Sequence, residues 1–462
     1  MSADPASKKA KIEATSKFPS DDAKPNNDQL LVAVPAAQGN QSEIFKLDVD
    51  CCEELFEWLS IKDLHAFGQT CKRMHRIAGM YFRQNYPCAH IFDKFNCIYY
   101  CSTQLDGFTE FVEHINCYSR AMDMVELEKI GAKCKSLKEI SFMTFDVEAI
   151  EKSEILSRIE SIQITGDRLN ERFLDLCPNL KRLLVEVGYS NDDHWLFELN
   201  KCPKLEFIKL TGIDMHIVGM ERFFDQIPHI RTIELNWRFL LENRDAFLGY
   251  NVKLDKLIVD FTDNEDEGDL KLICPLLNQL YDRGFYKRLH LTQLASGVSQ
   301  DTIDAMTTLR SFEALDIELE NEIVWPVMQS LKKIWIDDFD GIDFTTLPSK
   351  LPNLQQIHLP NTTVEPALPF IRCSKKLTEI RLVYLSEGPF LNQNILDLSA
   401  LNKEREKLAG ACKVTIYVPE EIFLETKFAS SVNYRLIEIK RHESMYSKIE
   451  WYLDSKESNV PN

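Results

Sequence analysis

The sequence predicts an α/β protein in which a long solenoid of strand–helix repeats follows a small all-α hairpin. Two observations predict this fold: a short apolar motif recurs from residue 137 onward, and residues 49–79 carry apolar side chains at helical spacing. A third observation bounds the folded part, because residues 1–42 contain no Trp, Tyr or Cys. That composition buries too little apolar surface to offset the entropy of ordering, so we expect a disordered N-terminal arm.

Composition narrows the class of function. The chain has 462 residues, a formal net charge of −18 and 44% hydrophobic residues. An acidic chain is a poor general binder of nucleic acid, which requires positive charge to displace counterions. We find no apolar run near the roughly 20 residues of a membrane span, and no apolar core of a secretory signal at the start. We therefore expect a cytoplasmic and/or nuclear protein whose 13 cysteines are reduced and mostly buried.

The first folded segment, residues 43–90, is predicted to be helical. Asp50 followed by Glu53 is a capping-box-like start, and Leu55, Phe56 and Leu59 then share one helical face. A second start follows at Ser60 and Asp63.

An apolar stripe at helical period continues through the same segment. Its members are spaced by 3, 4, 3 and 4 residues: Leu64, Phe67, Cys71, Met74 and Ala78. We expect Gly68 and Thr70 to divide it into two short helices, with Thr70 as the next cap. The hairpin has more apolar surface than it can bury internally, which indicates a partner. The alternative is that the hairpin packs on the rest of its own chain.

This segment resembles the F-box. The matching residues are Leu47, Leu55, Phe56, Leu59, Ser60, Asp63, Leu64, Cys71, Lys72 and Met74. The family usually has Pro after the first Leu, where this chain has Asp48. In the family, the apolar positions dock on a Skp-type adaptor of a cullin–RING ubiquitin ligase. The resemblance implies that adaptor-binding residues are Leu47, Leu55, Phe56, Leu59, Leu64, Cys71 and Met74.

Residues 91–133 connect the hairpin to the first repeat. They contain FTEFVEHI and AMDMVELEKI, so we expect a helical linker or cap.

The motif apolar-x-x-apolar-x-apolar then recurs through residues 134–440, before a C-terminal tail at 441–462. Eleven clear copies start at Leu137, Ile159, Leu180, Leu205, Ile230, Leu254, Tyr286, Phe312, Leu331, Leu354 and Leu377, and two weaker copies start at Ala411 and Tyr434. Most starts lie 20–29 residues apart, the spacing of leucine-rich repeats. Helical segments such as LNERFLDL and GMERFFDQI lie between copies. They argue against the alternative of a sandwich of short strands.

The series resembles an irregular, cysteine-containing leucine-rich-repeat array of the type that often follows an F-box. Several copies have Pro just before the strand, as in Cys177-Pro178-Asn179-Leu180. Proline there ends a helix and favours an extended conformation before it. Each unit cannot bury its apolar face alone, so stacked neighbours build one elongated core. The N-terminal Asn ladder of the family is largely missing, and Asn236 is one of few polar residues that could serve.

Side-chain alternation predicts which residues line the concave sheet. In the later copies one column is His290, Asp316, Trp335, His358 and Arg381, and the column two residues earlier is Arg288, Ala314, Lys333, Gln356 and Glu379. A Trp among cationic residues in a concavity resembles a binding hot spot. We therefore predict a substrate-binding patch of Arg288, His290, Lys333, Trp335, His358 and Arg381. Two alternatives stay open: the C-terminal tail covers Trp335, or the strand register differs.

Motifs of enzyme chemistry are absent from the sequence, which lacks G-x-x-x-x-G-K-S/T, G-x-G-x-x-G, G-x-S-x-G and H-E-x-x-H. We expect no catalytic residue and no cofactor. Cys88, His90, Cys97 and Cys101 cluster within 14 residues, but their spacing is not that of a usual zinc site.

An F-box beside a leucine-rich array implies a substrate receptor of an SCF-type ubiquitin ligase. The receptor would bind the Skp-type adaptor, through it the cullin and RING subunits, and a protein substrate. One alternative is an adaptor-binding leucine-rich-repeat scaffold outside any ubiquitin ligase. Another treats the Cys88–Cys101 cluster as a metal site that supports hydrolysis.

Overall fold

The computed structural model describes part of the chain, and all elements below belong to the unit that begins at Asp48. The described residues are 47–86, 88–92, 97–100, 103–122, 124–145, 153–165, 172–186, 199–211, 223–262, 269–294, 298–318, 323–337, 342–385, 391–392, 394–430 and 432–442. The predicted disordered arm (1–42) and all but the first two residues of the predicted tail (441–462) lie outside these residues.

The predicted hairpin is confirmed as three helices, α1 (Val49–Phe56), α2 (Ile61–Gly68) and α3 (Lys72–Asn85). Ser60 caps α2 as predicted, because its Oγ accepts from the backbone N–H of Asp63 at 3.1 Å.

Two other cap predictions were wrong by one or two residues. Asp48, not Asp50, caps α1, and its Oδ1 accepts from the N–H of Cys51 at 2.8 Å. Cys71, not Thr70, caps α3. Thr70 instead donates its hydroxyl to the carbonyl of Phe67 at 2.7 Å. Asp48 stands where the F-box family usually has Pro, and its carboxylate supplies the helix start by hydrogen bonding instead.

The segment expected to be a helical linker or cap, residues 91–133, contains strands as well as helix, which corrects the prediction. It contains β1 (Cys88–Phe92), β2 (Cys97–Tyr100), β3 (Thr103–Gln104) and β4 (His114–Met122). Among its described residues, the helical elements are a 3-10 turn, η2 (Thr109–Phe111), and helix α4 (Met124–Lys133). The segment FTEFVEHI (108–115) does not form the predicted helix, because its last residue, Ile115, pairs with Ile140 of the first predicted repeat strand. The sheet therefore begins before residue 134.

All thirteen predicted repeat strands are present, within a 17-stranded sheet. They are β5 (Glu139–Phe145), β6 (Ser161–Thr165), β7 (Arg182–Glu186), β8 (Phe207–Thr211), β9 (Thr232–Asn236), β10 (Leu254–Asp260), β11 (Tyr286–Leu294), β12 (Phe312–Ile317), β13 (Lys333–Ile336), β14 (Gln356–Thr362), β15 (Glu379–Leu385), β18 (Val414–Val418) and β19 (Ile437–Arg441). Neighbouring repeat strands pair in parallel, which is the arrangement of a leucine-rich-repeat solenoid.

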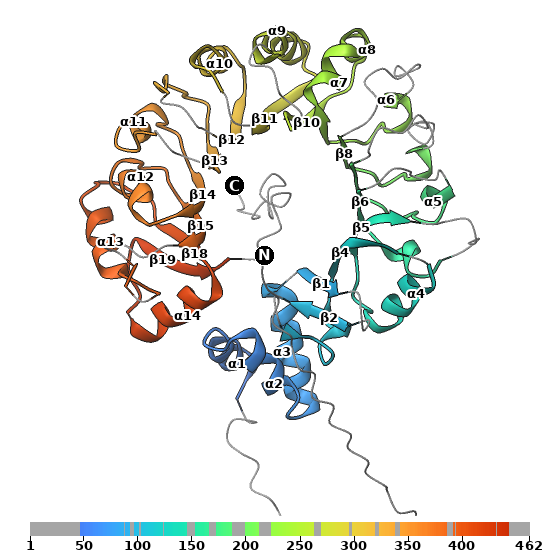
Figure 1. Ribbon diagram of the computed structural model, residues 1–462, viewed down its shortest axis with the longest axis vertical. Helices are drawn as coiled ribbons and strands as arrows, with labels where there is room; N and C mark the ends of the chain where they lie inside the picture. Colours follow the sequence, from blue (N-terminus) through green and yellow to red (C-terminus); the bar gives the residue numbers. More distant parts are fainter. Residues whose placement is uncertain are drawn as a thin grey trace, which may run out of the picture. The chain divides into compact units, whose positions relative to one another are not determined.

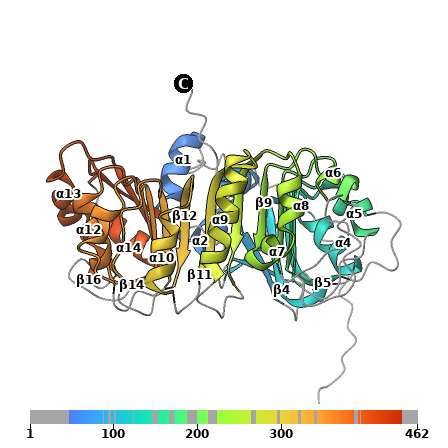
Figure 2. The same ribbon diagram turned by 90° about the horizontal axis from the view of Figure 1, so that it is seen from above.

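Helices and turns cover the outer side of this curved sheet, and the strands lie on the inner side (Figures 1 and 2). The connecting elements are η3 (Leu156–Arg158), α5 (Arg172–Asp175), α6 (Phe223–Gln226), α7 (Trp237–Glu242), α8 (Arg244–Gly249), α9 (Asp269–Asp282), α10 (Gln300–Met306), α11 (Leu347–Lys350), η6 (Glu365–Ala367), α12 (Leu368–Cys373), α13 (Leu398–Glu406) and α14 (Glu420–Ala429), with a short hairpin of β16 (Leu391–Asn392) and β17 (Ile395–Leu396). α5 and α6 lie within the two segments predicted to be helical, whose first residues (169–171 and 219–222) lie outside the described residues. The core lies between the sheet and this outer layer.

Two asparagines that follow a proline just before a repeat strand form hydrogen bonds to the neighbouring repeats. Asn179 donates to the carbonyl of Ser157 in the preceding repeat at 2.6 Å and accepts from Lys204 of the next at 2.5 Å. Asn353 makes the equivalent bonds, to Gln329 and from Lys376, both at 2.6 Å. Asn236, the residue expected to serve as a ladder member, instead caps α7 by accepting from the N–H of Arg238.

A buried arginine joins the last repeats. Arg405 on α13 is 0% exposed, and burial lowers the pKa of its guanidinium. The guanidinium donates to five backbone carbonyls at 2.8–3.3 Å, those of Ile371, Ser374, Lys375, Leu377 and Cys412. It therefore satisfies the carbonyls at the end of α12 and in the turn that follows.

We expect Arg405→Ala to lower the free energy of unfolding by about 3 kcal/mol or more, because it leaves several buried carbonyls without donors. Urea unfolding followed by circular dichroism measures the change. Arg372→Ala is the control, since Arg372 makes a half-exposed ion pair with Glu404 and should change stability by less than about 1 kcal/mol. Equal effects of the two substitutions would contradict the role given to Arg405.

Candidate functional site

The predicted adaptor-binding residues divide into two groups in the structure. Phe56, Leu64 and Met74 are fully buried inside the three-helix unit. The rings of Phe67 and Tyr81 each pack edge-on against Phe56 with centroids 5.4 Å apart. These buried side chains hold the helices together.

The other four predicted positions are partly accessible. They are Leu47, Leu55, Leu59 and Cys71, each half-buried. The sequence prediction did not include Val49 and Met80, which are 47% and 39% exposed on α1 and α3. These residues supply accessible apolar surface on the three-helix unit.

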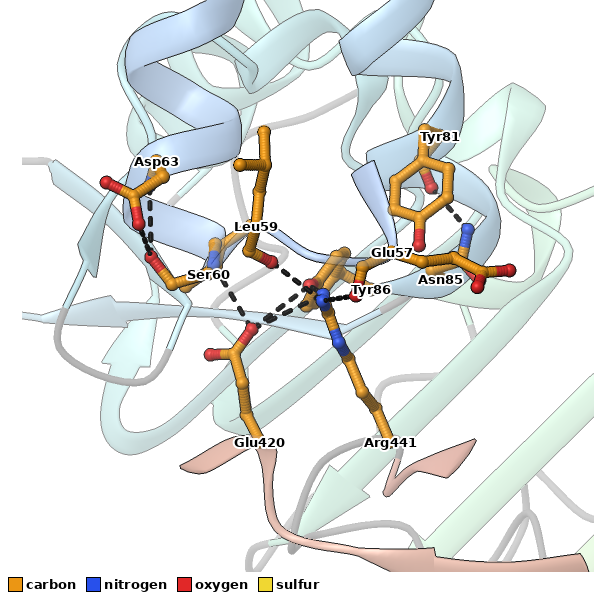
Figure 3. Close-up of polar contacts among 10 residues, drawn as sticks. Glu57, Leu59, Ser60, Asp63, Tyr81, Asn85, Tyr86, Glu420 and Arg441 are labelled. Carbon is orange, nitrogen blue, oxygen red and sulfur yellow. Dashed lines mark hydrogen bonds and ion pairs between the residues drawn. The ribbon is translucent and has the colours of Figure 1, made fainter. Parts of the chain in front are cut away.

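The junction between α1 and α2 is held by a side chain from the last strand of the sheet. Arg441, at the end of β19, donates from Nη2 to the carbonyls of Glu57 and Leu59, both at 2.7 Å (Figure 3). These carbonyls lie at the C-terminal end of α1, where the helix dipole favours a cation. The Arg441 side chain is only 11% exposed.

Glu420, at the start of α14, contacts the same junction beside Arg441 (Figure 3). Its Oε1 accepts from the N–H of Ile61, the first residue of α2, at 3.1 Å, and from the hydroxyl of Tyr86 at 3.1 Å. Arg441 also donates to the Tyr86 hydroxyl and lies 3.5 Å from the Glu420 carboxylate. An acid at the start of α2 and a base at the end of α1 match the polarity of both helix ends.

Aromatic and charged side chains extend this contact. Lys427 pairs with Glu57 and lies over the ring of Trp58, 4.9 Å from its centroid. The ring of Phe428, which is 66% exposed, lies 5.5 Å from that of Trp58. A cavity of about 650 Å³ opens between these residues and the last repeat, and Tyr81 and Lys440 are among its lining residues.

Burial changes the ionisation of groups at this contact. It raises the pKa of Glu420 to about 7, although the hydrogen bond from Ile61 opposes the change. It raises the pKa of Tyr81 to about 12. Glu420 and Arg441 were not predicted as site residues, because they lie more than 300 positions along the chain from the helices that they contact.

The concave columns predicted from the sequence are largely in register. In the earlier repeats, the residues at the corresponding strand position also pair successively across β5 to β10, and they are Ser141, Gln163, Leu184, Lys209, Glu234 and Ile258. In the later column, Asp316, Trp335, His358 and Arg381 also pair in order.

His290 and Arg288 are not in the predicted columns, because the register shifts between β11 and β12. His290 pairs with Ala314 instead of Asp316. Ser311, just before β12, has a positive φ of 54°, and so does Gln293 near the end of β11, at 56°. Left-handed residues beside paired strands are typical of bulges.

The predicted substrate-binding patch is less accessible than expected. Trp335, His358 and His290 are 6%, 2% and 1% exposed, whereas Arg288, Lys333 and Arg381 are half-buried. The rings of Trp335 and His358 lie against each other with centroids 3.3 Å apart. His442, which follows β19, packs its ring 5.9 Å from that of His358.

Arg381 is held in place by its neighbours. It donates to Glu379 at 2.5 Å and lies over the ring of Tyr417.

A buried ion network lies on the concave side of the earlier repeats. Lys209 reaches Glu234 at 3.0 Å and Glu186 at 3.3 Å, and Lys209 and Glu234 are almost fully buried. Asp260 is 1% exposed and accepts from the N–H of Thr262 at 2.9 Å. These residues lie on successive strands, and neighbouring strands are about 4.8 Å apart, so their charged groups can reach one another. Burial raises the pKa values of both Glu234 and Asp260, while Lys209 opposes the change.

The candidate metal site cannot be assembled from the described residues. Cys101 lies outside them, and within them no group of three or more His, Cys, Asp or Glu side chains is arranged to hold a metal ion. Burial raises the pKa values of the Cys134, Cys202 and Cys274 thiols to about 12, so these cysteines stay protonated apolar side chains. In the part of the chain that the structure describes, no helix is both long and apolar enough to cross a membrane.

Three capped helices ahead of a parallel-strand solenoid define a repeat protein with an N-terminal group of helices. The family model of the F-box domain matches residues 44–81, which span α1, α2 and most of α3. The chain therefore contains an F-box domain, and the parallel-strand solenoid that follows it is compatible with a leucine-rich-repeat array.

Comparisons over the whole chain identify no further family. A comparison with curated proteins finds no match. Among solved structures, a chain of the Toll–Spatzle complex of Drosophila, described as a molecular hub in development and innate immunity, is similar over 73% of this chain at 9% sequence identity. The TM-score is 0.24, and the match spans about half (55%) of that chain.

We expect Glu420→Gln to change the dependence of stability on pH. In the unfolded chain the carboxyl ionises near its ordinary pKa of 4.5, and in the folded protein near 7. The unfolded chain therefore loses its proton first, and Glu420 makes the protein less stable as the pH rises from 4.5 through 7. Gln keeps an acceptor for Ile61 and does not titrate, so the stability of the variant relative to wild type should grow by on the order of 3 kcal/mol across that range.

Urea unfolding at pH 5, 6, 7 and 8 measures this difference. Glu425→Gln, an exposed position on the same helix, is the control and should show no pH-dependent difference. A constant difference between Glu420→Gln and wild type from pH 5 to 8 would show that Glu420 ionises normally.

Proposed function

We propose that this protein is the substrate-recognition subunit of an SCF-type ubiquitin ligase in the cytoplasm and/or nucleus. The F-box domain binds a Skp-type adaptor, and through it the cullin and RING subunits. The observation that carries this proposal is the F-box match at residues 44–81 on three helices that expose apolar side chains. Apolar surface of this kind on a small helical unit is typical of a docking face.

The adaptor contacts are assigned to the accessible positions of the F-box. Leu55, Leu59, Leu47 and Cys71 are half-buried and so can be covered by a partner. Phe56, Leu64 and Met74 support them from inside. This division separates residues whose truncation removes contact area from those whose truncation unfolds the module.

The solenoid is assigned to a protein substrate, held on its concave face. Arg288, Lys333 and Arg381 supply partly accessible cationic groups there, above the buried Trp335, His358 and His290. In this role the protein has no active site of its own. It raises the effective concentration of substrate lysines near the ubiquitin-carrying enzyme, while the RING subunit and a conjugating enzyme perform the transfer.

We expect the tagged full chain to co-purify a Skp-type adaptor and a cullin, and Leu55→Ala/Leu59→Ala to lose both, because the adaptor interface loses apolar area. Circular dichroism and thermal unfolding check that the variant stays folded. The matched control is Leu272→Ala, since Leu272 is a 60% exposed leucine on the outer helix α9.

Other outcomes of the co-purification separate the candidate functions. Recovery of the adaptor without a cullin favours the scaffold outside any ubiquitin ligase. Failure of the wild-type chain to recover an adaptor would contradict both roles.

A further inference from the structure

The contact between the F-box and the last repeat involves the ends of all three F-box helices. Arg441 binds the carbonyls of Glu57 and Leu59 at the end of α1, and Glu420 binds the N–H of Ile61 at the start of α2. Tyr86, immediately after α3, bonds to both. Two side chains of the C-terminal repeat therefore fix three helix ends through one polar network.

The polarity of this network matches the backbone groups that it binds. Carbonyls at the end of α1 accept hydrogen bonds from the Arg441 cation, and an N–H at the start of α2 donates to a carboxyl oxygen of Glu420. The side chains of Arg441 and Glu420 are 11% and 29% exposed, so water competes weakly for these bonds. Bonds of this kind hold a backbone conformation more strongly than exposed ion pairs do.

The α1–α2 turn has few bonds of its own. Trp58 and Leu59 donate their N–H groups to the carbonyls of Leu55 and Phe56, at 3.0 and 3.1 Å. These three-residue turns are weaker than regular helical bonds. A helical unit of about 40 residues also has little core with which to hold such a turn.

We propose that Arg441 and Glu420 are positioning residues for adaptor binding. This inference rests on the proposed function of the F-box. The C-terminal repeat holds the α1–α2 junction in the conformation that the adaptor binds. It thereby positions Leu59, which lies within the junction, and Leu55, which lies in the last turn of α1 beside it. The adaptor-binding unit of this protein then comprises the F-box together with the last repeat.

The test compares variants of the full-length chain. Arg441→Ala removes the bonds to both carbonyls, Arg441→Lys keeps the charge but not the planar donors, and Arg435→Ala, at an exposed arginine of the same repeat, is the matched control. Isothermal titration calorimetry measures the Kd of each for a purified Skp-type adaptor. We expect Arg441→Ala to weaken binding about tenfold, Arg441→Lys to weaken it less, and Arg435→Ala to stay within about twofold of wild type.

Hydrogen exchange separates positioning from unfolding. In Arg441→Ala, amides of residues 57–63 should exchange faster, while those of the buried α3 residues Met74, Ile77, Ala78 and Phe82 should keep wild-type protection. If Arg441→Ala also loses protection in α3, the Kd for the adaptor and the hydrogen exchange of α3 are measured for Arg441→Lys instead. A weakened affinity with α3 intact supports positioning.

Two results would overturn the inference. One is an unchanged Kd of the Arg441 variants. The other is tighter binding, which would mean that the C-terminal repeat obstructs the adaptor face. Both are distinct from failure of the proposed function, in which the wild-type chain itself does not bind the adaptor.

Discussion

The structure depends on backbone hydrogen bonds between consecutive parallel strands, because no single repeat can satisfy its polar backbone or bury its apolar face alone. These bonds continue from β4 and β5 to β18 and β19. Their register aligns side chains of successive repeats in columns. The ion network of Lys209 with Glu186 and Glu234 exists because three neighbouring strands place these residues side by side. The register of strand pairing thus determines which side chains lie next to one another on the concave face.

The repeat array and the F-box are physically one unit. The F-box helices bury Phe56, Leu64 and Met74 among themselves, but the turn between α1 and α2 relies on Arg441 and Glu420. A solenoid of this curvature brings its last strand to the helices that precede its first strand (Figure 1). An autonomous module would carry such capping side chains within its own sequence. Here one hydrogen bond joins residues 382 positions apart.

The sequence predicted the features that depend on local period. The repeat strands were found because apolar residues alternate with period 2 in every copy, and α2 was found because Ser60 and Asp63 form a local cap. The caps of α1 and α3 were misplaced because Asp48 and Cys71, which lie within two residues of the predicted caps, make the bonds instead. The shift at His290 was not predictable, because it depends on positive φ values at Gln293 and Ser311, residues without the usual glycine signal.

The end of β19 connects the two candidate surfaces. Strand side chains alternate between faces, so neighbouring residues at the end of a strand point in opposite directions. Arg441 binds the α1–α2 junction of the F-box, while the ring of His442 packs against His358 on the concave side. On the adjacent strand, Tyr417 pairs with Lys440 and lies beneath Arg381. The positions of the concave patch and of the F-box junction are therefore set by the same pair of strands, β18 and β19.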